Sequence, residues 1–67
     1  MSELRTAILR HLVGRTVTAN QMAFLLGKGD LDVAEEMGRL HRERLIEGTL
    51  DDKGFWIYEA LTDPTIN

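Results

Sequence analysis

The stretch Val17-Thr-Ala-Asn-Gln-Met-Ala-Phe-Leu-Leu-Gly27 decides the fold, because two start motifs agree on where one helix begins. With Thr18 as the N-cap, Gln21 falls at the third helical position, which is the spacing of a capping box. In the same register Val17 precedes the cap and Met22 follows it by four positions, the spacing of a hydrophobic staple. The two motifs together predict a helix that starts directly after Thr18.

The segments before this helix and the residue that follows it also show patterns that predict secondary structure. Gly27 is placed to end it, so we expect the helix over residues 19–26. Upstream, apolar residues at helical spacing predict a helix over 2–13, with Ser2 as its N-cap and Gly14 at its end. Thr16-Val17-Thr18 is short and β-branched, which is enough for a stub of strand.

A longer third helix is predicted to follow the turn Gly27-Lys28-Gly29. Asp30 is expected to be its N-cap, and its end is expected at Glu43 or Arg44. The apolar spacing predicts a core-facing stripe with three members and the aliphatic stem of Arg44 as a further candidate; the three are Val33, Met37 and Leu40.

Two strands and a tight turn are predicted after this helix. The segments 45–50 and 55–60 are rich in apolar and β-branched residues, and Asp51-Asp52-Lys53-Gly54 between them is typical of a hairpin turn. Because strand side chains alternate, Phe55 and Trp56 should point to opposite faces, one into the core and the other covered or exposed. The tail 62–67 contains Pro64 and is expected to fray.

Length and composition exclude several classes of protein. A chain of 67 residues fits one small domain, taken here as 1–67. It is 43% hydrophobic and 28% charged, as is usual for soluble globular proteins. The longest apolar run, residues 22–26, is too short to span a membrane, and no secretory signal is recognisable at the start. With no cysteine, disulfides and thiolate sites are excluded, and we expect a cytoplasmic protein.

Residue types that build active sites are sparse. His11 and His41 lack metal-binding spacing, so we interpret both as boundary or surface residues. Ser2 is the one serine, and no threonine or lysine has a recognisable base. Lys28 between two glycines lacks the preceding strand and the spacing of a phosphate-binding loop. We therefore expect no enzymatic activity, no metal and no cofactor.

The order of the predicted elements resembles a winged helix-turn-helix domain. It is most similar to small single-domain regulators of bacteria, phages and plasmids such as the PapI/FaeA-like proteins. The resemblance covers about residues 3–61 and is carried by Thr18–Gly27, the Val33…Met37…Leu40…Leu45-Ile46 pattern and Gly54–Tyr58. It implies a mainly α fold of three helices plus a β hairpin, the wing. In such domains the third helix enters the DNA major groove and the wing lies beside it.

The resemblance assigns a recognition face to the third helix and contacts to the wing. The recognition face comprises the positions off the buried stripe near the helix start, which are Leu31, Asp32, Glu35, Glu36 and Arg39. The wing would contribute Asp52 and Lys53, next to Asp51. Carboxylates outnumber basic residues in both sets, and carboxylates do not supply the counterion release that drives DNA binding. Arg39 is also within reach of Glu35 and Glu43 at four-residue spacing, which would partly neutralise it.

Charge is divided unevenly along the chain. Residues 1–28 contain four basic side chains and one acidic, a net charge of +3, whereas residues 29–67 contain four basic and ten acidic, a net charge of −6. Phosphate contacts are therefore expected from the basic residues of the first half, Arg5, Arg10, Arg15 and Lys28, and from the start of the short helix. The residues selected as contacts are Arg15, Thr18 and Lys28.

Two functions of different class follow from these patterns. The first is a small DNA-binding transcriptional regulator that acts on double-stranded DNA as a homodimer or beside a partner, because one module of this size recognises few base pairs. The alternative is an acidic winged-helix module that binds a basic protein surface in place of DNA, since a fold does not determine a function.

Overall fold

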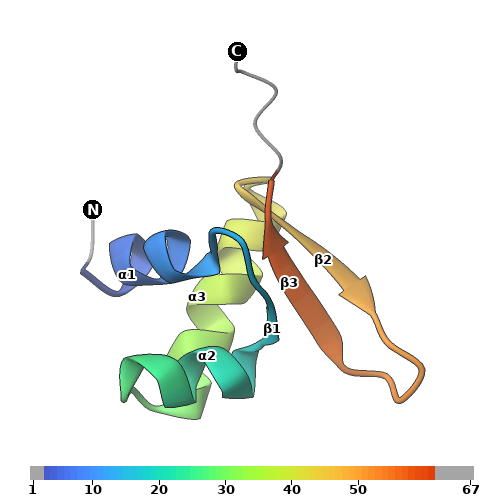
Figure 1. The fold of residues 1–67 in the computed structure, drawn as a ribbon, viewed down its shortest axis with the longest axis horizontal. Coiled ribbons are helices and arrows are strands. Elements are labelled where there is room, and N and C mark those ends of the chain that lie inside the picture. Colours follow the sequence, from blue (N-terminus) through green and yellow to red (C-terminus); the bar gives the residue numbers. More distant parts are fainter. Residues whose placement is uncertain (1–2, 62–67) are drawn as a thin grey trace.

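Three helices and three strands make up the part of the chain that the structure, a computed structural model, describes, residues 3–61. Their order along the chain is α1 Glu3–Leu12, β1 Thr16–Thr18, α2 Ala19–Leu26, α3 Asp30–Arg42, β2 Ile46–Leu50 and β3 Trp56–Ala60 (Figure 1). The expected N-cap Ser2 and the expected frayed tail 62–67 lie outside the described residues.

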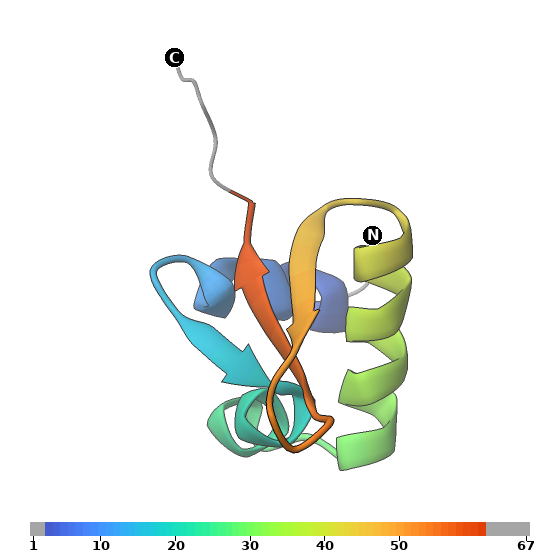
Figure 2. The same cartoon turned by 90° about the vertical axis from the view of Figure 1, so that its right-hand side faces the viewer.

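The strands form one antiparallel sheet in the order β1-β3-β2. The stub β1 pairs Thr16 with Glu59, and the hairpin closes with Leu50 opposite Trp56. Figure 2 shows the helices packed against the sheet, and Figure 1 shows the β2–β3 hairpin projecting away from them. The predicted fold class is confirmed, because three helices and a small antiparallel sheet stand in a winged-helix-like arrangement.

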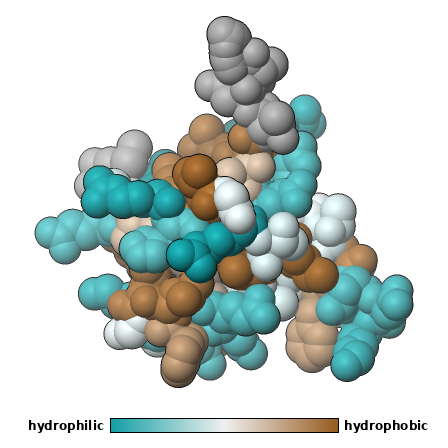
Figure 3. Space-filling model, viewed as in Figure 1, coloured by the Kyte–Doolittle hydropathy of each residue, from teal (hydrophilic) through white to brown (hydrophobic). Residues whose placement is uncertain are grey.

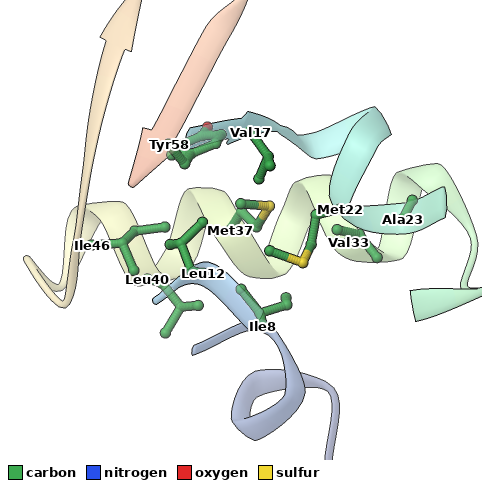
Figure 4. Packing of buried hydrophobic residues seen from close by; sticks show 10 residues of the cluster. All are labelled: Ile8, Leu12, Val17, Met22, Ala23, Val33, Met37, Leu40, Ile46 and Tyr58. Atoms are coloured by element: carbon green, nitrogen blue, oxygen red, sulfur yellow. The ribbon is translucent and has the colours of Figure 1, made fainter. Parts of the chain in front are cut away.

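The core forms where α1, α2 and the sheet meet α3 (Figure 4). The predicted stripe of α3 is confirmed, since all three of its residues are fully buried. Arg44 does not extend this stripe, because it follows α3 in the left-handed region at φ 64° and is exposed. Among residues 3–61, the ten buried hydrophobic residues are Ile8, Leu12, Val17, Met22, Ala23, Val33, Met37, Leu40, Ile46 and Tyr58.

The predicted start and end of α2 are confirmed in atomic detail. The Thr18 side-chain oxygen accepts a hydrogen bond from the Gln21 backbone N–H at 3.2 Å, and the Gln21 side chain accepts one from the Thr18 N–H at 2.9 Å. Gly27 ends the helix in the left-handed conformation at φ 66°, where glycine has no steric penalty. The local pattern was sufficient here because every partner lies within a few residues.

The start of α3 differs from the prediction. Gly29 is the N-cap, in extended conformation, and Asp30 is the first helical residue. The carbonyl of Gly29 accepts from the Val33 N–H at 3.1 Å, and no side chain caps the helix. Asp30 and Asp32 consequently favour the helix only through their charge near its positive end. The helix ends at Arg42 with Glu43 as C-cap, one residue before the first predicted end.

The hairpin turn is confirmed, but the aromatic side chains beside it are placed differently. One carboxylate oxygen of Asp51 accepts from the backbone N–H groups of Lys53 and Phe55, both at 2.8 Å. Phe55 and Trp56 are both exposed, at 57% and 44%, and the core aromatic residue is Tyr58. The prediction that one of the pair enters the core is wrong, because the hairpin carries both past the helices that cover Tyr58.

Candidate nucleic-acid interface

The start of α3, the α2–α3 turn and the wing turn all lie toward the lower end of the molecule, with α2 between the α2–α3 turn and the wing turn (Figures 1 and 2). Leu31 at the first turn of α3 is 81% exposed, and Asp32 and Glu35 are exposed as well. Figure 3 shows apolar surface over α2 at this end of the molecule. Four of the five predicted recognition-face residues are thus exposed, and Glu36 is the exception.

Glu36 does not belong to this surface, which corrects the prediction. It is 8% exposed, and its two carboxylate oxygens are bound by two arginines from different sides. Arg5 of α1 donates from Nε at 3.0 Å, and Arg39 donates from Nη1 at 2.7 Å. Glu36 therefore serves the packing of α1 on α3 and is not available to a partner at the recognition face.

The partner of Arg39 also differs from the expectation. Arg39 pairs with Glu36, three residues earlier, and not with Glu35 or Glu43 at four-residue spacing. Glu43 is bound by Arg5 Nη2 at 2.6 Å, and this hydrogen bond is the largest contribution that raises the pKa of Arg5 above its usual value. Helical spacing allowed several ion pairs for Arg39 within α3. Arg5 of α1 binds both Glu36 and Glu43, and this contact between helices determines which ion pairs form.

The structure separates the residues predicted to contact phosphate. Lys28 is exposed in the α2–α3 turn, at the same end as the recognition face and the wing residues Asp52 and Lys53. Arg15 is exposed in the α1–β1 turn, beside Thr16, which pairs with Glu59 near the end of β3 away from the wing turn. Arg15 and Lys28 both belong to the basic first half of the sequence, but the register of the sheet places Arg15 at the end of the molecule opposite to Lys28.

Thr18 is positioned between these two regions and is already engaged. Its backbone N–H and its side-chain oxygen both take part in the capping box. The next two residues, Ala19 and Asn20, begin α2 and border a groove at the base of the wing.

This groove, which we call the wing groove, lies between the start of α2, the side of α3 and the wing. Its volume is about 250 Å³. The wing contributes the exposed aromatic residues Phe55 and Trp56 to its lining, and α3 contributes only Ala34. The lining residues are Thr18, Ala19, Asn20, Ala34, Phe55, Trp56 and Tyr58.

Two aromatic residues that line the groove, Trp56 and Tyr58, form a cluster with His41. Trp56 and Tyr58 are nearly parallel at 18°, with centroids 6.3 Å apart. The His41 ring packs on both, at 5.2 Å from Trp56 and 5.9 Å from Tyr58. Burial raises the pKa of the Tyr58 hydroxyl. His41, interpreted from the sequence as a boundary or surface residue, is half-buried and packs against Trp56.

Gly48 makes this cluster possible. It pairs with Tyr58 across the hairpin, and a Cβ atom at this position would lie 3.0 Å from the Tyr58 ring and 3.3 Å from His41. A glycine inside a strand often marks such a close approach. A glycine inside the predicted strand 45–50 is therefore the sequence feature that could have indicated this cluster, which was not predicted.

The remaining findings concern membranes, metals and relatives. Among residues 3–61 no helix is both long and apolar enough to cross a membrane, and no group of three or more histidine and carboxylate side chains is arranged to hold a metal ion. The chain matches no family model, no curated protein and no solved structure.

Proposed function

We propose that the protein is a small winged-helix transcriptional regulator that binds double-stranded DNA, of the kind represented by the PapI/FaeA-like proteins. The observation that carries this proposal is the grouping of the open α3 face, Lys28 and the wing at one end of the molecule. A protruding helix flanked by a wing is the geometry with which such domains enter the major groove.

Because Glu36 is buried, the proposed DNA-binding face carries one carboxylate fewer than the sequence suggests. The sequence places three carboxylates among the five recognition-face positions, but the structure neutralises Glu36 between two arginines. Asp51, beside the wing contacts, is likewise used within the turn. The exposed acidic residues that remain near DNA are Asp30, Asp32, Glu35 and Asp52.

The proposed mechanism is binding without chemistry, and it needs no cofactor. The core stripe and the Arg5–Glu36 pair hold α3 rigidly against α1, so its outward face is preorganised. One copy reads few base pairs, so a homodimer or a second protein would supply the additional contacts.

A salt series with one matched pair of variants tests DNA binding. Lys28→Ala should weaken binding to all sequences alike and reduce the slope of log affinity against log salt by about one, because one phosphate contact is lost. Arg15→Ala removes the same charge at the opposite end of the molecule and should leave the slope unchanged. A parent slope near zero would refute DNA binding, and equal losses in both variants would refute the proposed orientation.

A protein-binding module remains the second candidate, favoured by the exposed apolar Leu31 between acidic neighbours on α3. An apolar residue ringed by carboxylates suits a basic protein surface. Glu35→Gln separates the two functions because it changes one exposed carboxylate and leaves the core alone. It should retain or tighten DNA binding in the first case. In the second case it should slow association with a basic partner at low salt without any gain in DNA affinity.

A further inference from the structure

We propose that the wing groove is a stacking site for one unpaired nucleobase, with Trp56 and Phe55 as its platform. This inference rests on the proposed function, since it names the part of the nucleic acid that the wing contacts. It follows from the charge of the wing, from the size of the groove and from the way in which Trp56 is supported.

The wing is unsuited to phosphate and well suited to ring surfaces. Its turn carries Asp51 and Asp52 against the single cation of Lys53, so it cannot contribute counterion release. It exposes instead three large apolar side chains, with 58% of Leu50, 57% of Phe55 and 44% of Trp56 open to solvent. Aromatic side chains bind bases of any sequence through their ring faces.

The groove has room for one ring system. Its volume is about 250 Å³, whereas a cavity of about 150 Å³ holds a benzene molecule. On the side of α3, the small residue Ala34 is the one that lines the groove.

Trp56 is held in position before any ligand arrives. His41 and Tyr58 pack against its ring, and Gly48 leaves the space that this packing needs. At the rim, the exposed Asn20 offers an amide donor and an acceptor to the edge of a base. A base inside a duplex presents only its edges to a protein, so ring stacking requires a base that has left the helix.

The experiment compares three labelled DNA hairpins of one sequence by fluorescence anisotropy. The first is fully paired, the second carries one bulged thymine, and the third carries an abasic bulge at the same place. We expect the bulged thymine to bind about tenfold more tightly than the paired and abasic hairpins. Trp56 is the only tryptophan, so its fluorescence should be quenched by the bulged thymine alone.

Matched variants assign the preference to the groove. Trp56→Leu and Phe55→Leu should each abolish the preference for the bulged thymine while binding to the paired hairpin persists. Phe24→Leu changes an aromatic residue that is 87% exposed on α2 and outside the groove, and it should retain the preference. Circular dichroism checks that each variant is folded, and Phe55, outside the strands, is the substitution least able to disturb the sheet.

The outcomes separate this inference from the proposed function. Salt-dependent binding to the paired hairpin with no preference for the bulged thymine would overturn the stacking site and leave the regulator intact. Equal preference for the thymine and abasic bulges would also overturn it, because flexibility and not stacking would then be recognised. Failure to bind any hairpin would overturn both proposals. An apolar protein segment would then be the ligand expected in the groove.

Discussion

Two glycines, Gly38 and Gly48, show how differently one residue type is used in this protein. Gly38 lies inside α3 with open space around its missing Cβ, whereas Gly48 lies on β2 against the Tyr58 ring. Gly38→Ala should stabilise the protein by about 0.5–1 kcal/mol through helix propensity. Gly48→Ala should destabilise it by about 1–3 kcal/mol, because the ring cluster must be displaced. Urea unfolding of both variants measures the two values, and a shift of the same sign in both would contradict the packing described here.

At the scale of the element, α2 depends on the capping box formed by Thr18 and Gln21. Thr18→Ala should destabilise the protein by about 0.5–2 kcal/mol, because the N–H of Gln21 loses its partner. Thr16→Ala removes a threonine of the same strand that is exposed, and it should change stability by no more than about 0.5 kcal/mol. Thermal unfolding followed by circular dichroism compares the two, and equal midpoints would mean that the cap contributes nothing.

At the scale of the whole molecule, α1 and α3 are joined by the ion pairs of Arg5, Glu36, Arg39 and Glu43. Glu36→Gln keeps the shape of the side chain and removes the charge that both arginines share. We expect its melting temperature to fall by on the order of 5 °C, because the site is largely closed to water. Glu43→Gln breaks the more exposed pair and should cost less. A larger loss for Glu43→Gln would contradict a central role for Glu36.

The ion pairs of Glu36 also determine which glutamate can be substituted to test partner choice. Glu35 and Glu36 are neighbours in the sequence, but Glu35 is exposed and Glu36 is buried. A double substitution would therefore mix a change of surface charge with a loss of stability. The single variant Glu35→Gln is the one that tests partner choice.

The sequence by itself determined the features whose partners lie within a few residues. The capping box of Thr18 and Gln21, the end of α2 at Gly27 and the hairpin turn were all predictable, since each depends on local hydrogen bonds or on one left-handed glycine. The buried stripe of α3 was predictable from helical spacing alone. The cap of α3 was the local exception, because Gly29 took the position assigned to Asp30.

Only the tertiary structure decided what depends on contacts between distant segments. Arg5 lies 31 residues from Glu36, and their pairing moved that carboxylate from the recognition face into the α1–α3 contact. The register of β1 on β3 places Arg15 at the end of the sheet away from the wing turn. The hairpin extends beyond the helices, so Trp56 lies outside the core. Periodicity shows which side of an element is buried, but the packing of elements on one another determines which residues meet.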